Sequence, residues 1–315
     1  MGSCVSKDTY SYIKRLTLRE KKSHSDNNHN ENFQYIDGRR FHNVMTVKYP
    51  LPNDGQECDR LHTQHFLHRY IWQSNFSSPV EQILKNDGER AKVLDVGCGA
   101  ATWLFEMATS YPNADFTGFD MSPHQPTQIK PFNAEFVVGN VLDGLTFEDD
   151  TFDFIYQRML FAAYPKSKWM FVINELVRVL KPGGYLELTE IDPLVKHVGP
   201  ASKLFYESAC KAFERLGTDP RSCYELQNYA MIQGKLENIR KEEKNICFGK
   251  NSGALGKVAI ENNIEVLESL KPLMSKSLNL SSEQYDELSQ TITKELSDFN
   301  SYYPVIRVYA RKIRV

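Results

Sequence analysis

Short apolar runs alternate with amphipathic stretches through the middle of the chain. Residues 100–110 have helical composition, and residues 168–180 carry apolar side chains at helical spacing. The segment 181–184, Lys-Pro-Gly-Gly, ends the second helix, because proline cannot continue it and glycine suits a left-handed cap. Five runs are typical of buried strands: 91–94, 114–119, 135–138, 152–156 and 185–191. Strands that alternate with helices predict an α/β fold with a parallel sheet and right-handed crossovers.

The pattern continues beyond residue 192. Amphipathic spacing predicts three more helices: 202–216, 255–273 and 281–300. Two further strands are expected: 235–248 and 303–313. The last strand holds three cationic residues that we interpret as a solvated strand face: Arg307, Arg311 and Lys312. We expect the helix over 255–273 to cover the mouth of a substrate site.

An extended segment and a helix precede the first strand of the sheet. Residues 49–54 are extended and then turn, and Asp54 with Glu57 forms a start that resembles a capping box. The helix should run to about Trp72. Several polar residues fall three or four positions apart and could share one face: Arg60, Gln64, His65 and His68.

The most informative motif follows the first strand of the expected sheet. Asp95-Val96-Gly97-Cys98-Gly99 leads from that strand into a helix, and its two glycines let the backbone turn tightly and pass close to a ligand. A helix N-terminus offers free N–H groups and positive partial charge. The next strand delivers Asp120, 21 residues after Gly99, where a carboxylate could accept both hydroxyls of a ribose. The motif predicts a nucleoside-binding site.

The type of nucleoside follows from the third position of the fingerprint. A dinucleotide site needs G-x-G-x-x-G, and Thr102 stands where the third glycine should fall. The acid before G-x-G instead resembles the first motif of class I S-adenosylmethionine-dependent methyltransferases. That family usually has a further glycine at the place of Ala101, so this chain departs from it there. A nicotinamide-dependent oxidoreductase stays an alternative that cofactor binding would decide.

Longer segments narrow the resemblance. "FDFIYQRML", "ELVRVLKPGGYLELTE" and residues 38–72 resemble a fungal branch of the superfamily that includes the LaeA-type regulators. The likeness covers most of 38–315 and is loose after Asp192. It implies a Rossmann-like class I methyltransferase fold, which is a mostly parallel seven-stranded sheet with helices on both faces. It also implies that the last strand, 303–313, runs antiparallel beside 185–191.

The resemblance implies S-adenosylmethionine as cofactor and assigns the residues that hold it. Gly97, Cys98 and Gly99 approach its methionine half, and Asp95 orients the amino group directly or through water. Asp120, with Met121 beside it, holds the ribose. Asn140 and the backbone of Val141 contact the adenine. Gln157 faces the methyl group. The entry helix lies near the cofactor mouth, where two side chains could meet the cofactor carboxylate or the substrate: Arg60 and His65.

Other interpretations of these residues stay open. Asp120 could cap the turn at Ser122, and Asn140 could be a turn residue only. Gln157 could bond neighbouring backbone, and Cys98 is interpreted as a small packed residue without a second thiol nearby. The candidate general base is His65, but polar packing of its helix accounts for it equally well.

Two functions are consistent with these motifs. The first is methyl transfer to an unknown small-molecule or protein acceptor. Tyr156-Gln157-Arg158-Met159 replaces the [DNS]-P-P-[YFW] motif of many nucleobase methyltransferases, which disfavours nucleic-acid bases. The second is a non-catalytic S-adenosylmethionine-binding protein that regulates secondary metabolism or development through protein partners. No metal is indicated.

Length, composition and charge limit the domain organisation and the classes of partner. A chain of 315 residues with 41% hydrophobic content can form one large α/β domain with a cap. The net charge of −2 disfavours a general nucleic-acid binder, and six dispersed cysteines indicate a reducing, cytoplasmic compartment. No apolar run approaches the roughly 18 residues of a membrane span. We expect four regions: a basic disordered tail, a helical entry segment, a methyltransferase core and a C-terminal cap (1–32, 33–90, 91–192 and 193–315).

The N-terminus matches the pattern of a lipid-anchor signal. Met-Gly-Ser-Cys-Val-Ser fits the N-myristoylation pattern at Gly2, and the nearby Cys4 could be palmitoylated. Residues 1–22 hold six basic and two acidic side chains, which favour an anionic membrane surface. One acyl chain binds only marginally, so the second signal matters. We expect peripheral contact with the cytoplasmic face of a membrane, and the alternative is a disordered tail whose motif arises by chance.

Overall fold

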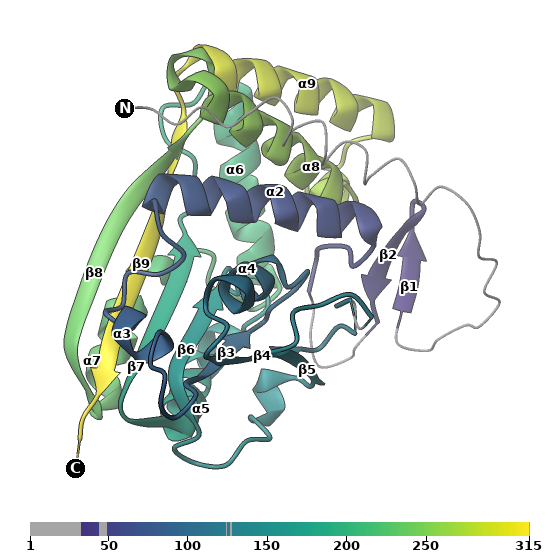
Figure 1. Ribbon diagram of the computed structural model, residues 1–315. Coiled ribbons are helices and arrows are strands. Elements are labelled where there is room, and N and C mark those ends of the chain that lie inside the picture. The colour runs from purple at the N-terminus through teal and green to yellow at the C-terminus, as the bar shows by residue number, and fades with distance from the viewer. Residues whose placement is uncertain (1–32, 44–48, 124, 127, 315) are drawn as a thin grey trace.

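The computed structural model describes residues 33–43, 49–123, 125–126 and 128–314. Its main element is a seven-stranded sheet of order β5-β4-β3-β6-β7-β9-β8 (Figure 1). Five neighbouring strands are parallel: β3 (Lys92–Val96), β4 (Asp115–Asp120), β5 (Ala134–Val138), β6 (Phe152–Arg158) and β7 (Leu180–Ile191). β9 (Tyr302–Lys312) runs antiparallel between β7 and β8 (Leu236–Cys247). The predicted fold class, including the antiparallel last strand, is confirmed.

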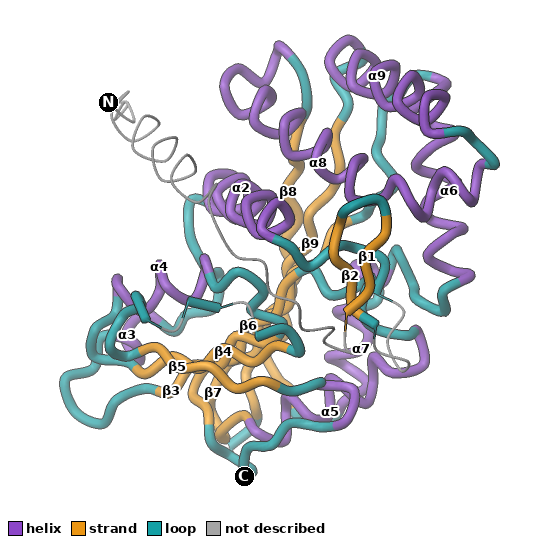
Figure 2. Tube along the Cα trace, turned by 90° about the vertical axis from the view of Figure 1, so that its right-hand side faces the viewer, coloured by secondary structure: helices purple, strands orange, loops and turns teal. Residues whose placement is uncertain are grey.

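Helices cover both faces of the sheet. Figure 2 shows it between α3 (Glu81–Leu84) and α4 (Thr102–Ser110) on one side and α5 (Trp169–Val179) and α7 (Leu226–Gln233) on the other. Consecutive residues of β3 pack into different hydrophobic cores. Val93 packs with Trp103 and Met107, whereas Leu94 packs with Val172 and Leu176. Successive side chains point to opposite faces, so a strand buried on both sides reads as a continuous apolar run.

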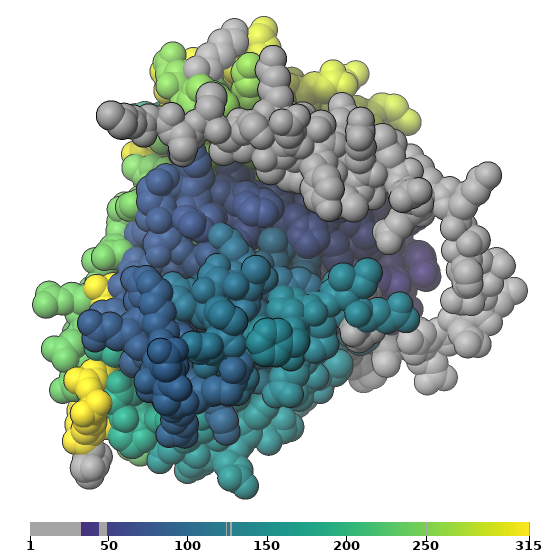
Figure 3. All heavy atoms as spheres, viewed as in Figure 1, coloured from purple at the N-terminus to yellow at the C-terminus, as the bar shows by residue number. Residues whose placement is uncertain are grey.

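The remaining helices form a second layer beyond the core. α2 (Gly55–Trp72) lies between the sheet and α8 (Gly253–Leu278), and α6 (Pro200–Arg215) and α9 (Ser282–Asp298) pack against α8. In the space-filling view α2 forms a band between the core and these C-terminal helices (Figure 3). Over the described residues, none of the helices combines the length and the apolar character that a membrane crossing requires.

The entry segment differs from the expected helical one. It begins with a hairpin of β1 (Phe33–Ile36) and β2 (Arg39–His42), and α2 follows. The hairpin turns at Asp37 and Gly38, whose φ angles are 50° and 78°. An Asp-Gly pair with both φ positive is the sequence signature of a type I′ turn, and this local signal was missed. Asp54 caps α2 by accepting from Glu57 N–H, as expected, but the Glu57 carboxylate accepts from Arg60 and does not complete a capping box.

The prediction of a solvated face on β9 is wrong. Arg307 is 2% exposed, because β9 is an interior strand and the end of α2 packs over it. Its Nε lies 3.1 Å from Glu187 Oε1, and its Nη1 donates to Ser77 Oγ. The guanidinium also stacks on Trp72, 4.2 Å from the ring centroid. The other two cations are half-buried: Arg311 and Lys312.

Arg307 should therefore contribute far more to stability than Arg311 on the same strand. Arg307→Ala leaves the Glu187 carboxylate buried without its counter-charge, and we expect a loss of about 3 kcal/mol in the free energy of unfolding. Arg311→Ala, which removes only a bond to Gly183 O, should cost less than about 1 kcal/mol. Urea denaturation of both variants measures this. Equal midpoints for the two would contradict the account of β9.

Candidate functional site

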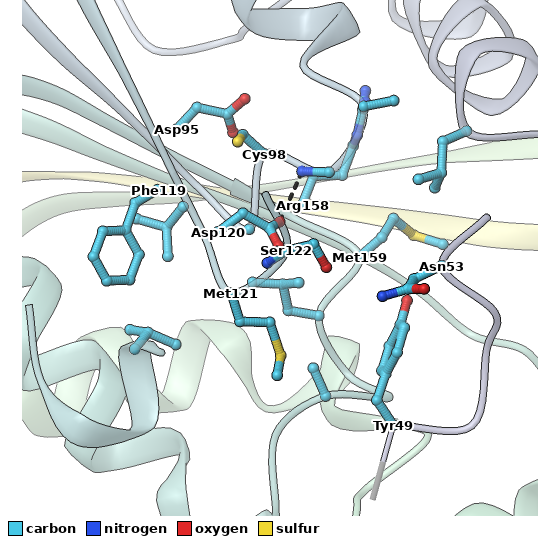
Figure 4. A pocket seen from close by; sticks show the side chains of 18 of the residues that line it. Tyr49, Asn53, Asp95, Cys98, Phe119, Asp120, Met121, Ser122, Arg158 and Met159 are labelled. Atoms are coloured by element: carbon cyan, nitrogen blue, oxygen red, sulfur yellow. Dashed lines mark hydrogen bonds between the residues drawn. The ribbon is translucent and has the colours of Figure 1, made fainter. Parts of the chain in front are cut away.

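The carboxyl ends of the central strands open into one pocket. Its floor comes from the ends of β3, β4 and β6 and from the turn after β5, and its far wall comes from α2 and residues 49–54 (Figure 4). Residues expected to hold a cofactor line it together: Asp95, Gly97, Cys98, Gly99, Asp120, Met121, Asn140 and Val141. The parallel register brings them together, since Asp95 pairs with both Gly118 and Tyr156. This is the edge at which open α/β sheets bind ligands.

The turn after β3 requires glycine. Gly97 and Gly99 have φ angles of 69° and 52°. A Cβ on Gly97 would lie 2.6 Å from the terminal methyl groups of Leu160, so a larger residue requires that side chain to move. Ala101, at the place of the family's usual third glycine, adopts φ 60° as the N-cap of α4. This left-handed conformation costs a residue with a Cβ roughly 1–2 kcal/mol, and alanine is the smallest such residue.

Asp120 serves the turn as well as the pocket. Its Oδ2 accepts from Gly99 N–H at 2.8 Å, and its Oδ1 accepts from Ser122 N–H at 2.8 Å. Burial raises the pKa of this carboxyl, and the backbone donors of Ser122 and Gly99 oppose the rise. Asp120 therefore caps the turn at Ser122, and it also lines the pocket. A carboxylate with about four lone-pair sites keeps acceptor capacity for a ligand.

Asp95 lies deeper and has no such donors. The side chain is 4% exposed, and no hydrogen bond from a described group contributes to its pKa. Burial raises its pKa to about 7, while the charge of Arg158 lowers it and that of Asp120 raises it. A buried carboxylate without a donor is destabilised unless a ligand provides one. Asp95 is thus suited to receive a cationic donor from the pocket.

Asn140 and Val141 lie at the end of the third strand of the pocket. Asn140 Oδ1 accepts from Leu142 N–H at 3.1 Å and caps the short 3-10 helix Val141–Asp143. The turn interpretation of Asn140 therefore holds, and the residue also lines the pocket. Its amide N–H₂ is the part of the side chain that this cap leaves available.

Two predicted catalytic residues lie outside the pocket lining. Gln157 is buried, and its Oε1 accepts from the hydroxyl of Tyr164, which does line the pocket. His65 Nε2 is 2.6 Å from Glu106 Oε2, and its Nδ1 is 3.3 Å from Nη2 of Arg158. Burial lowers the pKa of His65 to about 4, so the ring is neutral near pH 7.

The polar face of α2 turns inward. Arg60 and His68 are buried, and Arg60 pairs with Glu57 at 2.6 Å, so neither is a surface residue. From this face Gln64 lines the pocket. Residues of α8 do not appear among the described lining, because α8 packs on α2 and α9 instead of over the mouth.

Sequence reasoning missed the contribution of the hairpin. His42 Nε2 lies 2.8 Å from Ser122 Oγ, and Asn53 Nδ2 lies 3.1 Å from the same nitrogen. Arg39 forms a bidentate pair with Asp54, the N-cap of α2, at 2.6 and 3.0 Å. The hairpin is therefore attached both to the loop after Asp120 and to the start of α2. The available signal was the Asp37-Gly38 pair, which is typical of a hairpin turn.

The pocket lining combines carboxylates at the strand ends with aromatic and aliphatic side chains from residue 49, α2 and the loop after β6: Tyr49, Leu61, Met159 and Leu160. The carboxylates of Asp54 and Glu57 are already paired with arginines. In the described part of the chain, no three His, Cys, Asp or Glu side chains gather as a metal site would require.

Part of this sequence is similar to known proteins. Residues 93–184 match the family model described as "Methyltransferase domain". Methyltransferase pytC of Aspergillus terreus is 33% identical over 162 residues, which cover 51% of this chain and 47% of that protein. Secondary metabolism regulator laeA of Aspergillus niger is 32% identical over 161 residues, 51% of this chain and 41% of that protein. Protein-methionine methyltransferase laeA of Emericella nidulans is 29% identical over 170 residues, which cover 54% of this chain and 43% of that protein.

The sheet order, the glycine turn between two acids and the matched domain define a class I methyltransferase domain. Residues 93–184 are thus similar to S-adenosylmethionine-dependent methyltransferases, and about half of the chain is similar to the fungal laeA and pytC proteins. The matched segments span about half the length of these curated relatives.

The closed environment of Gly97 yields a prediction with a matched control. Gly38 also has positive φ, but a Cβ there meets nothing within 4 Å. Gly38→Ala should cost roughly 1 kcal/mol of stability from backbone strain alone. Gly97→Ala should cost about 2–4 kcal/mol, because it adds the clash with Leu160 to the same strain. Denaturant midpoints compare the two, and similar losses would show that Leu160 does not close the turn.

Proposed function

We propose that this pocket binds S-adenosylmethionine and that the chain transfers its methyl group to a small-molecule or protein acceptor. The observation that carries the proposal is the placement of Asp95 and Asp120 on either side of the Gly97–Gly99 turn. Asp95 would receive the ammonium of the methionine half, and Asp120 would accept the ribose hydroxyls. Asn140 and the backbone of Val141 would contact the adenine.

The proposed mechanism depends on positioning and exclusion of water. When bound, the cofactor supplies an electrophilic methyl group on a cationic sulfonium. The chain's own residues fix the geometry for in-line attack, and the apolar wall of Tyr49, Met159 and Leu160 excludes water on the acceptor side. We propose that Gln157 acts by orienting Tyr164, since its Oε1 accepts from that hydroxyl.

A regulatory function is the second candidate. It is favoured by the relative whose printed name is secondary metabolism regulator laeA. In this alternative the chain keeps the cofactor pocket and acts through regulatory protein partners. Cofactor binding is common to both candidates, so only turnover with an acceptor separates them. A protein acceptor is supported by the relative named a protein-methionine methyltransferase, and the net charge of −2 disfavours nucleic acid.

A labelled-methyl assay tests the proposal. Wild-type chain with methyl-labelled S-adenosylmethionine should label a component of fractionated fungal extract. Asp120→Asn keeps the shape of the side chain and removes its charge, and we expect cofactor affinity to fall at least about tenfold, with labelling reduced in parallel. Asp115→Asn, at the other end of the same strand and paired with Arg90, is the control that should retain both.

Two outcomes would contradict the proposed methyl transfer at this pocket. Labelling that persists undiminished in Asp120→Asn at limiting cofactor would place the cofactor elsewhere. Loss of cofactor binding in that variant, with every cellular effect of the chain retained, would remove support from methyl transfer and favour the regulatory candidate.

We also propose that the N-terminus attaches the chain to the cytoplasmic face of a membrane. The residues concerned, Gly2 and Cys4 within the basic segment 1–32, lie outside the described residues, and support comes from the sequence pattern alone. Intact mass of the chain produced in a eukaryotic host should show loss of Met1 and gain of a myristoyl group. A Gly2→Ala variant is the control that should stay unmodified, and an unmodified wild-type Gly2 would end the proposal.

A further inference from the structure

The loop after β6 forms part of the pocket wall and carries backbone strain. Four of its side chains line the pocket: Met159, Leu160, Ala163 and Tyr164. Met159, which Figure 4 shows among the lining side chains, has a φ of 62°. A residue other than glycine loses about 1–3 kcal/mol in that region and keeps the conformation only where its surroundings impose it. Groups outside the loop must therefore hold it in place.

A buried carboxylate holds this loop from the end of β7. Glu190 is 1% exposed. Its Oε1 accepts from Leu160 N–H at 2.7 Å, and its Oε2 accepts from Phe161 N–H at 3.3 Å. Leu160 O in turn accepts from the N–H groups of Ala163 and Tyr164, at 2.9 and 3.1 Å. The loop is thus a single helical turn, and Glu190 caps its amino end, where N–H groups lack a partner within the turn.

Within the described part of the chain, no cation neutralises this carboxylate. Burial raises the pKa of Glu190 to about 8, the N–H donors of Leu160 and Phe161 oppose the rise, and no charge of a described residue contributes to it. Both oxygens accept fully only when the carboxyl is ionised, because one oxygen of the protonated form carries a hydrogen. The anchor should therefore be complete above about pH 8 and weaker below it.

The loop packs directly on the glycine turn. The terminal methyl groups of Leu160 lie 2.6 Å from the place that a Cβ on Gly97 would take. At the other end of the loop, the hydroxyl of Tyr164 donates to Gln157 at 2.9 Å. A shift of the loop would therefore change the space beside the turn and the orientation of a phenol that lines the pocket.

We infer that Glu190 is a positioning residue for methyl transfer, which places the acceptor relative to the cofactor by holding the N–H groups of Leu160 and Phe161. The inference rests on the proposed function, in which this loop lies on the acceptor side. Glu190 is not among the described residues that line the pocket, so it acts through the loop and not by contact with a reactant. In-line transfer is sensitive to such placement, since a displacement of about 1 Å can lower a rate on the order of 100-fold.

The test separates turnover from cofactor binding. Glu190→Gln keeps the shape of the side chain and one acceptor oxygen, but it places an amide N–H₂ group opposite a backbone donor. At about pH 9 and saturating methyl-labelled S-adenosylmethionine, the rate of labelling of fractionated fungal extract should fall at least about tenfold. The calorimetric affinity for S-adenosylmethionine should stay within about threefold of wild type, which also shows that the variant is folded.

Glu295 provides a matched control. Its Oε1 and Oε2 accept from the N–H groups of Ala201 and Ser202 at 3.1 and 2.7 Å, at the start of α6 and outside the pocket lining. Glu295→Gln removes the same kind of anchor from a different place. It should change neither the labelling rate nor the affinity for S-adenosylmethionine.

The pH dependence gives a second readout that includes the unchanged protein. Three titratable groups respond to the charge of Glu190: Tyr49, Tyr164 and Cys223. Burial raises the pKa of all three above their ordinary values of 10.0 and 9.0, so they stay neutral up to about pH 9. Asp95, with a pKa of about 7, titrates in wild type and variant alike. The ratio of wild-type to Glu190→Gln labelling should therefore rise at least about threefold from about pH 7 to about pH 9, as Glu190 ionises.

The outcomes separate this inference from the function on which it rests. Wild type that labels no component would overturn the proposed methyl transfer and the inference together. Wild type that labels, with an equal rate in Glu190→Gln at both pH values, would overturn the inference alone. A loss of cofactor affinity in proportion to the loss of labelling would assign Glu190 to the fold or the cofactor site and likewise overturn it, as would equal losses in Glu190→Gln and Glu295→Gln.

Discussion

The hydrogen bond from Gly99 N–H to Asp120 Oδ2 connects the two strand ends on which the site depends. It fixes the glycine turn after β3 against the end of β4, at the edge where parallel strands leave their backbone groups open to a ligand. The same carboxylate holds Ser122 N–H, and Ser122 in turn contacts His42 of the hairpin. Through these hydrogen bonds, Asp120 connects the glycine turn, the following loop and the hairpin that borders the pocket.

Charge is distributed around this bond in a consistent way. Near α2, carboxylates are neutralised by arginines, as in the pairs of Asp54 with Arg39 and of Glu57 with Arg60. At the strand ends, Asp95 and Arg158 are left without an ion pair among the described residues. Unpaired buried charge is costly, and proteins concentrate it at sites that bind ligands. The contrast between the two regions supports the assignment of the ligand to the strand ends.

Much of the fold could be predicted from the sequence, because periodicity is local. The apolar runs, the helical spacing of Trp169–Val179 and the stop at 181–184 all depend on near neighbours, and the sheet they predict is the one observed. β7 begins at Leu180, earlier than the expected residue 185, since the segment after the helix pairs with β6 at once. The Asp37-Gly38 turn was equally local and was overlooked.

The site could be predicted only in part. The motif brought Asp95, Gly97, Gly99 and Asp120 into one pocket, because a strand end and a glycine turn carry their geometry with them. Which face of α2 turns inward depends on how that helix docks, so His65 was expected at the pocket and lies behind Arg158. Arg307 was interpreted as solvated because its partner, Glu187, is 120 positions away in the chain.

The central claim is that this pocket binds S-adenosylmethionine rather than a dinucleotide. Calorimetric titration of the wild-type chain with S-adenosylmethionine and with NAD, under identical conditions, tests it most directly. The account predicts saturable binding of S-adenosylmethionine and no measurable binding of NAD, because Thr102 replaces the glycine that a pyrophosphate site needs. Tight binding of NAD with no binding of S-adenosylmethionine would contradict it.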